Sequence, residues 1–168
     1  MPAGKKQIFL GVDPGLADVG FGLVAQKNGK LKIIDYGSIK TKKETAPAER
    51  LKQIASRLDK IIKKYKPNFA AVEELFFCKN IKTGIAVGQA RGVIILTIIK
   101  NKLPITEFTP LQVKQAVTGY GRAEKGQVQQ MVKIILNLKE APKPDDAADA
   151  LAVAICAASS LALMSLKK

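Results

Sequence analysis

The stretch Ile8-Phe9-Leu10-Gly11-Val12-Asp13-Pro14-Gly15 decides how this chain folds. An apolar run leads up to an acid, and the Pro-Gly pair then breaks the run. A short apolar segment bounded by turn residues is typical of a strand that is buried in the middle of a sheet. We therefore expect a strand over 8–13, with the carboxyl group of Asp13 at its end.

Working outward from this strand, similar apolar runs predict the rest of a sheet. We expect further strands at 20–25, 31–39, 69–73 and 104–108. The turn Gln26-Lys27-Asn28-Gly29 joins the first two of these as a hairpin. Helical spacing of apolar residues predicts helices from Pro47 to a stop at Lys66, from Pro110, around 128–135 and from Asp145 onward. Early strands followed by alternating strands and helices indicate an α/β fold with a mixed sheet.

The composition is that of a globular domain with a strong excess of positive charge. The 168 residues suffice for one domain with a buried core, and 47% of them are apolar. Lysine and arginine number 28 against 14 acids, which gives a formal net charge of +14. Such an excess favours a polyanionic partner, either nucleic acid or an acidic membrane surface.

The cysteines, the apolar C-terminal stretch and the absence of histidine limit where the protein is located and which catalytic chemistry it can use. Cys78 and Cys156 make no disulfide framework, and we expect no secretory signal, so the expected location is the cytoplasm. The stretch 147–166 is long enough to cross a bilayer, but Asp149 and three serines within it favour a buried core helix. The sequence has no histidine, which excludes Ser-His-Asp catalysis, Cys-His catalysis and histidine-bound zinc.

Four acids occupy positions where an acid is structurally inconvenient. Asp13 and Glu73 each end an apolar strand. Asp146 and Asp149 are three residues apart at a helix start and share one face, with Cβ atoms about 5–6 Å apart. Ordinary explanations exist, because Asp146 suits a helix cap, Asp13 a turn and Glu73 a solvated strand end. Asp149 is harder to explain in this way, since it lies among alanines and a leucine.

If these acids converge, they require cations. Two like charges about 5 Å apart repel by roughly 3 kcal/mol at an effective dielectric constant of about 20. Oxygen ligands without histidine or thiolate suit Mg²⁺ or Mn²⁺. Two such ions about 4 Å apart activate a water molecule and stabilise the leaving oxygen of a phosphodiester. The spacing of the acids along the chain leaves their convergence open.

Six short blocks stand in order along the chain: GVDPG at 11–15, VE at 72–73, GQARG at 88–92, QVKQ at 112–115, AEKGQVQ at 123–129 and DAADALA at 146–152. Together they resemble the RuvC family of Holliday-junction nucleases. The resemblance extends over about 8–157, so we expect a single nuclease domain over 1–168. It implies an RNase H-like fold, with a mixed five-stranded sheet flanked by helices.

The resemblance also implies an activity. A homodimer would resolve four-way (Holliday) DNA junctions during recombination and repair by nicking two strands symmetrically, as a Mg²⁺-dependent endodeoxyribonuclease. Mn²⁺ is the alternative ion, and two ions are expected in each active site. By position, Asp13, Glu73, Asp146 and Asp149 take the family's catalytic and metal-binding places. Branch-migration proteins of the RuvA and RuvB kind are candidate partners, and no membrane association is expected.

Further residues are expected to hold DNA. Phe76 matches the aromatic residue that the family places at the junction centre, and Lys79 follows it closely. Lys114 and Lys125 match basic residues that handle the cut strand. Arg122 belongs to a glycine-containing loop that offers amide groups and cations to a phosphate. The alternative interpretation is that Phe76 is an ordinary core residue and that the lysines are solvated surface side chains.

Gly84, Gly88 and Gly92 recur every fourth residue within 79–100. The tail of this segment has strand composition, and the resemblance is the main reason to expect a helix over all of it. Each helical glycine costs roughly 1 kcal/mol relative to alanine, so three together indicate close packing, either against the sheet or against a second copy of the chain. The family uses this helix near its dimer interface, where we expect the three glycines to lie.

Three other functions compete with this interpretation. An ATP-binding protein of the actin/hexokinase type shares the Asp-Pro-Gly loop, but it needs two such domains around its nucleotide. A nuclease of the same fold acting on another substrate, such as RNA–DNA hybrids or free ends, is disfavoured only through the resemblance. A non-catalytic basic DNA-binding protein needs charge alone, and metal-dependent cutting would distinguish the nuclease from it.

Overall fold

The computed structural model describes residues 5–75 and 81–166, and every strand and helix expected from the sequence is found there. The elements are β1 (Gln7–Asp13), β2 (Asp18–Lys27), β3 (Lys30–Lys40), α1 (Pro47–Tyr65), β4 (Phe69–Glu73), α2 (Ile81–Lys100), β5 (Ile105–Phe108), α3 (Pro110–Thr118), α4 (Lys125–Ile135) and α5 (Asp145–Leu166). The segment 93–99, whose composition is strand-like, is helical within α2.

The strands form one mixed sheet in the order β3-β2-β1-β4-β5. β1 pairs antiparallel with β2 and parallel with β4, which itself pairs parallel with β5. Because β1 and β4 are parallel neighbours, their carboxyl ends meet at one edge of the sheet. Val12 lies opposite Val72 in this pairing, so Asp13 and Glu73 come next on the two strands.

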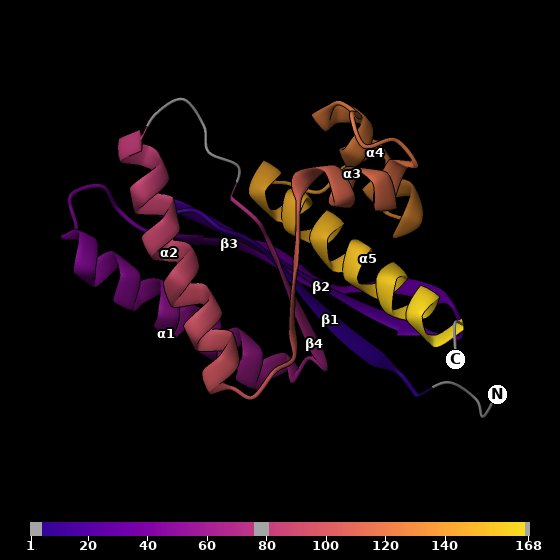
Figure 1. The fold of residues 1–168 in the computed structure, drawn as a ribbon, viewed down its shortest axis with the longest axis horizontal. Coiled ribbons are helices and arrows are strands. Elements are labelled where there is room, and N and C mark those ends of the chain that lie inside the picture. Colours follow the sequence, from indigo (N-terminus) through magenta and orange to yellow (C-terminus); the bar gives the residue numbers. More distant parts are fainter. Residues whose placement is uncertain (1–4, 76–80, 167–168) are drawn as a thin grey trace.

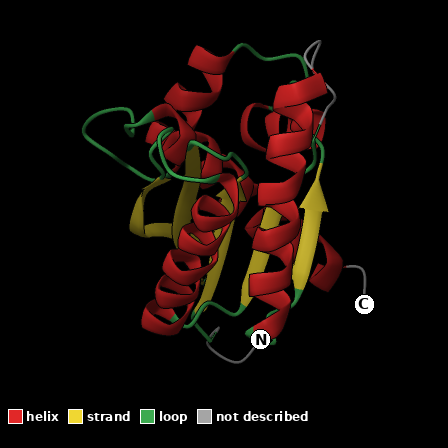
Figure 2. Ribbon diagram, turned by 90° about the vertical axis from the view of Figure 1, so that its left-hand side faces the viewer, coloured by secondary structure: helices red, strands yellow, loops and turns green. Residues whose placement is uncertain are grey.

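Helices cover both faces of the sheet. α1 and α2 lie on one face, and α5 crosses the other face with α3 and α4 packed beyond it (Figure 1). Figure 2 looks onto the two helices of the first face, with the strands behind them. Side chains alternate between the faces along a strand. Leu10 and Val12 therefore join the core under α1 and α2, whereas Phe9 joins the core under α5.

Glycines let the backbone of α5 lie directly on the sheet. A Cβ atom on Gly11 would lie 2.1 Å from the carbonyl oxygen of Ala150, and one on Gly20 would lie 1.9 Å from the carbonyl oxygen of Asp146. No side chain fits there. Residues 147, 148 and 150–158 of α5 are buried, so the long apolar run at the end of the chain is a core helix, as expected from its sequence.

The glycines of α2 behave differently. Among the described residues, a Cβ atom on Gly84 or Gly92 would meet nothing within 4 Å, and one on Gly88 would meet only the Cδ1 atom of Leu75, at 3.9 Å. The expectation that these glycines pack against the sheet is therefore wrong. The other expectation, that they pack against a second copy of the chain, stays a prediction.

α2 also exposes apolar side chains on the surface of the single chain. Ile85, Leu96 and Ile99 are 60%, 56% and 53% exposed. Within the described residues, Thr83–Lys100 is the one segment long and apolar enough to span a membrane by composition. Ala90, Ile94 and Ile98 are nevertheless buried in the core shared with α1, so α2 is a half-covered surface helix.

Candidate active site

Three of the four acids singled out in the sequence lie together at the edge of the sheet where β1 ends. Asp13 ends β1, and Asp146 and Asp149 lie in the first turns of α5. Carboxylate oxygens from the three residues all lie within 4.8 Å of one another. The close contact between α5 and the sheet glycines produces this approach, because it sets the start of the helix directly over the end of the strand.

Glu73 joins this group from the neighbouring strand. It lines a cavity of about 220 Å³ together with Asp149, Lys114 and Lys125, and the remaining walls are apolar. At about 30 Å³ per water molecule, such a cavity holds several waters. Pro110, Val113, Val128 and Ala152 form the apolar walls. The cavity is therefore lined by both acidic and basic side chains, and it leaves room for solvent beside the three-acid group.

Burial and mutual repulsion disturb the ionisation of these acids. The pKa of Asp13 is raised to about 8, mainly by burial and in addition by the charges of Glu73, Asp149 and Asp146. Burial likewise raises the pKa of Glu73 to about 7, with a contribution from Asp149. The pKa of Asp146 is raised by burial and by the nearby charge of Asp18. Near neutral pH the group must therefore hold protons or bind cations.

Lys125 is the cation that the chain itself supplies to this group. Its Nζ atom lies 3.0 Å from Asp149 and 3.4 Å from Asp145. Partial burial is the largest single effect on the pKa of Lys125 and lowers it, but the hydrogen bonds and charges of Asp149 and Asp145 together outweigh burial, and the pKa is raised overall. The lysine starts α4, which begins at a capping box made by Glu124 and Gln127. Because the capping box fixes where α4 begins, the ammonium group of Lys125 lies next to the acids.

Lys114 approaches the cavity from α3. This helix begins at Thr109, whose hydroxyl accepts a hydrogen bond from the backbone N–H of Gln112 at 3.2 Å, and Val113 and Val117 bury its inner face. The charge of Lys114 lowers the pKa of Glu73, against the effect of burial. Both lysines singled out by their position in the sequence blocks therefore line the cavity.

The remaining candidates lie elsewhere. Arg122 is exposed in the loop between α3 and α4 and does not line the cavity. Phe76, Lys79 and Cys78 lie outside the described residues. Cys156 is buried in the core of α5, and burial raises the pKa of its thiol to about 11. Because the thiolate is the reactive form, Cys156 is an inert core residue at neutral pH.

Two polar residues near the site were not singled out from the sequence. Asp18 starts β2, and its Oδ1 atom is the one buried side-chain oxygen without a hydrogen-bond partner in the described part of the chain. Arg91 forms an ion pair with Glu107 and donates to the carbonyl oxygen of Glu73 at 3.4 Å, so it ties together the ends of β4 and β5. Arg91 lies inside the block GQARG, whereas Asp18 carries no sequence signal beyond the preceding turn.

The sheet order, the parallel pair β1–β4 and the acids on and above its carboxyl end define the class. The protein is an RNase H-like nuclease. The family model described as "Crossover junction endodeoxyribonuclease RuvC" matches residues 9–157. The chain belongs to the RuvC family of crossover junction endodeoxyribonucleases.

Individual relatives agree with this assignment over almost the whole chain. The RuvC protein of Alkaliphilus metalliredigens is 56% identical over 161 residues, covering 96% of this chain and 98% of the relative. That of Halothermothrix orenii is 58% identical over 156 residues, covering 93% and 94%. The structure of T. thermophilus RuvC in complex with a Holliday junction substrate superposes with a TM-score of 0.89 at 35% identity, covering 94% of this chain and 96% of that one.

Proposed function

We propose that the protein resolves four-way DNA junctions as a homodimer, and that each subunit nicks one strand at the group formed by Asp13, Glu73, Asp146 and Asp149. The observation that carries this proposal is the approach of three carboxylates from distant parts of the chain to within 4.8 Å. The T. thermophilus relative, whose structure contains a Holliday junction substrate, supports the choice of DNA.

The donor set fits divalent metal ions of the magnesium type. All four candidate ligands are carboxylates, and hard oxygen donors are what Mg²⁺ and Mn²⁺ prefer. The raised pKa values of Asp13 and Glu73 show how poorly the group tolerates its own charge without cations. Two bound ions, held by these acids, would supply Lewis-acid activation of a water molecule and stabilisation of the leaving oxygen.

The side chains of the chain itself have separate tasks in this proposal. Asp13 and Glu73 hold cations at the end of the central strands, with Asp149 opposite them on α5. Asp146 either holds a cation or accepts the proton of the attacking water. Lys125 and Lys114, which line the cavity, neutralise the scissile phosphate. Lys125 must exchange its contact with Asp149 for one with the phosphate when DNA enters.

The dimer is proposed to form through α2. Within the described part of the chain, the space above Gly84 and Gly92 is open and that above Gly88 is bordered only by Leu75, so a second backbone can approach closely. The exposed Ile85, Leu96 and Ile99 give it apolar surface to cover. A second copy related by a two-fold axis presents the same face, as dimers of identical chains do. Two active sites on one dimer then meet two strands of a symmetric junction.

The wider setting follows from the same proposal. Phe76 and Lys79 remain predicted contacts at the junction centre, and Arg122 a predicted contact to a phosphate beyond the cavity. Proteins of the RuvA and RuvB kind stay candidate partners. A location in the cytoplasm follows from a chromosomal DNA substrate.

A substrate comparison tests the proposal. Purified protein is incubated with a labelled four-way junction, a duplex of the same arm sequence and an RNA–DNA hybrid, in Mg²⁺, in Mn²⁺ and in EDTA. We expect paired, symmetric nicks in the junction alone, and only with a divalent ion. Cutting of the hybrid would instead indicate an RNase H-type substrate, and binding of the junction without any nick would indicate a non-catalytic DNA-binding protein.

A further inference from the structure

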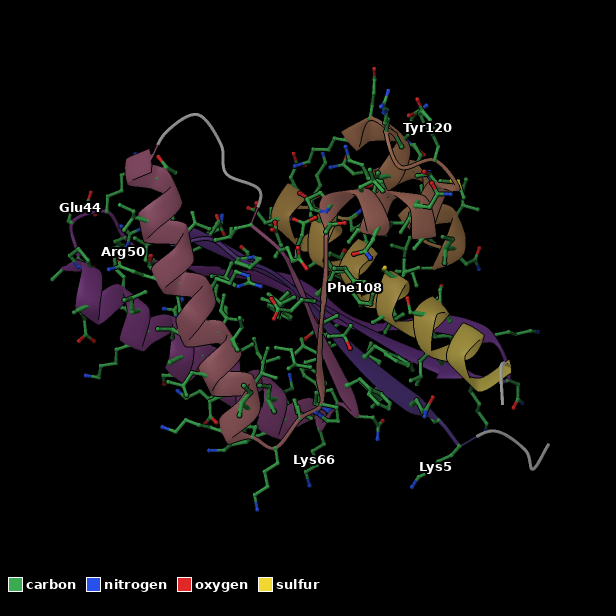
Figure 3. All side chains as sticks on the ribbon, viewed as in Figure 1. Lys5, Glu44, Arg50, Lys66, Phe108 and Tyr120 are labelled. Carbon is green, nitrogen blue, oxygen red and sulfur yellow. The ribbon has the colours of Figure 1, made fainter. Side chains whose placement is uncertain are left out.

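Tyr120 is a large aromatic side chain that the fold does not use. It lies in the loop 118–124 between α3 and α4 and is 59% exposed. Figure 3 shows it at the outer end of these two helices, away from the sheet. Its ring is absent from both core clusters, so neither the packing of the core nor the catalytic cavity accounts for it.

The backbone that carries this ring is fixed on several sides. The N–H of Tyr120 donates to the Thr118 hydroxyl at 3.1 Å, and its carbonyl accepts from the N–H of Ala123 at 3.1 Å. Gly119 before it adopts a φ of +76° as the cap of α3, and its carbonyl accepts from the Gln115 amide at 2.8 Å. A backbone held in this way fixes the point from which the side chain projects, and that lowers the entropy cost of binding.

Glycine at position 121 seats the loop against α3. A Cβ atom there would lie 3.0 Å from the Cγ atom of Leu111, a contact tighter than ordinary packing allows. Leu111 is itself 57% exposed, so apolar surface continues from the loop onto α3. The loop is therefore a built platform with an aromatic ring on its outer side.

A cavity of about 460 Å³ opens beside the ring. Its walls include Met131 together with Gln127 and Gln130, whose side chains end in amide groups. The Oε1 atom of Gln127 accepts a hydrogen bond from the N–H of Glu124 at 2.8 Å, which fixes the orientation of that side chain. An aromatic face, an apolar thioether, the oriented amide of Gln127 and the amide of Gln130 together match a flat heterocycle whose edge carries donors and acceptors.

The cavity lies across the first turn of α4 from the active site. Lys125 and Val128 line the catalytic cavity, whereas Gly126 and Gln127 line this one. A helix with its side chains is about 10–12 Å across, which corresponds to about three nucleotides at 3.4 Å per nucleotide along one strand. A strand cut beside Lys125 that continues across α4 would therefore reach this cavity a few nucleotides from the scissile phosphate.

We propose that this cavity is a nucleobase subsite, in which one unstacked base of the cut strand stacks on Tyr120. Gln127 and Gln130 contact the edge of the base, and Arg122 in the same loop contacts its phosphate. The subsite deepens the proposed junction nuclease function and rests on it. It would give the enzyme a preference for the base at one position near the cut.

An abasic scan tests the subsite. Junctions carry an abasic site at each of several positions around the cut, placed symmetrically in both target strands, and affinity is measured in EDTA for wild type and Tyr120→Leu. For wild type we expect a loss of about tenfold at one position, in the range of one base–aromatic stack. On intact DNA, Tyr120→Leu should bind more weakly than wild type by a similar factor. An abasic site at that one position should not weaken its binding further, because the substitution and the missing base remove the same contact.

Two variants serve as controls. Tyr120→Phe keeps the ring and should bind intact DNA like wild type. Tyr36→Leu makes the same change at the other exposed tyrosine of the described chain, on the edge strand β3, and should leave the scan unchanged. The subsite would be overturned if the abasic site and Tyr120→Leu reduced junction affinity additively at every scanned position. It would also be overturned if Tyr120→Leu bound intact DNA as tightly as wild type.

The scan is independent of cutting. Nicking of the intact junction by wild type in Mg²⁺ reports on the proposed nuclease function. If no nicking occurred, the binding scan in EDTA would still support or overturn the subsite. Circular dichroism of Tyr120→Leu should match wild type, since the ring packs in neither core cluster.

Discussion

Replacing Asp13 with asparagine should make the metal-free protein more stable while abolishing nicking. The carboxyl group of Asp13 is buried at the end of β1 beside Glu73, Asp146 and Asp149, and its pKa is raised from 3.8 to about 8. Asparagine has nearly the same shape and carries no charge. The substitution therefore replaces a carboxyl group that the folded protein must keep protonated with a group that is always neutral, and it creates no cavity.

The size of the effect follows from the linkage between protonation and folding. The folded protein keeps the Asp13 proton up to about pH 8, whereas the unfolded chain releases it near pH 3.8. Between these values the folded state binds more protons, so the free energy of unfolding falls as the pH rises. At pH 7 this costs wild type at most about 4 kcal/mol at 1.36 kcal/mol per pKa unit, and relaxation of the site reduces it to about 2–4 kcal/mol.

Urea unfolding in EDTA at a fixed protein concentration measures the free-energy difference, and thermal unfolding under the same conditions measures the shift in melting temperature. At 2–4 °C per kcal/mol for a chain of this size, Asp13→Asn should melt about 5–15 °C above wild type at pH 7. The gap should narrow as the pH falls and close below about pH 3.8, where the folded and the unfolded states of wild type both hold the proton. Asp59→Asn is the matched control, because hydrogen bonds from Lys63 and Asn101 lower the pKa of that exposed acid and its loss should slightly destabilise. A less stable Asp13→Asn protein, or a gap that does not change with pH, would refute the reasoning.

Four other outcomes follow from the structure. Lys125→Met removes the cation 3.0 Å from Asp149, so Mn²⁺ should bind more tightly in calorimetric titration while nicking slows by about 100-fold or more; weaker Mn²⁺ binding would contradict this. Gly88→Leu should weaken the dimer in sedimentation and keep the circular dichroism of a folded chain, and an unchanged dimer would count against the α2 interface. Gly11→Ala should destabilise by about 3 kcal/mol or more in urea, because its Cβ would lie 2.1 Å from a carbonyl oxygen of α5, and wild-type stability would mean that α5 lies farther from the sheet. Junction affinity should fall about 1,000-fold between about 50 and 200 mM salt if about six phosphates are neutralised, and a flat response would speak against a basic DNA-binding surface.

The strands and the positions of the acids could be predicted because local patterns encode them. Asp13 and Glu73 each end an apolar run between turn residues, and Asp146 and Asp149 share a helix face by their spacing. Their meeting could not be derived in this way. It depends on the parallel pairing of β1 with β4, across two strands and a helix, and on backbone contacts of Gly11 and Gly20 with α5 that no local pattern reveals.

Residues whose role depends on tertiary contacts were harder to find. Lys125 is one of 28 basic residues, and only its place in the block AEKGQVQ distinguished it before its contact with Asp149 was seen. Tyr120 has no periodic signal, because a loop residue gains its surroundings from the two helices it joins. The glycines of α2 stand out in the sequence by their spacing, but that pattern alone does not distinguish packing on the sheet from an outward-facing surface.

The central claim is that four carboxylates from β1, β4 and α5 jointly hold divalent cations. Crystals grown with Mn²⁺ and measured at the manganese absorption edge test it most directly, because anomalous difference density locates the ion without reference to any assay. Strong density is expected within ligand distance of Asp13, Asp146 and Asp149, with Glu73 beside it, and it should be lost in Asp13→Asn. A protein that nicks junctions in Mn²⁺ but shows no density there, or shows it at another group of residues, would contradict the account.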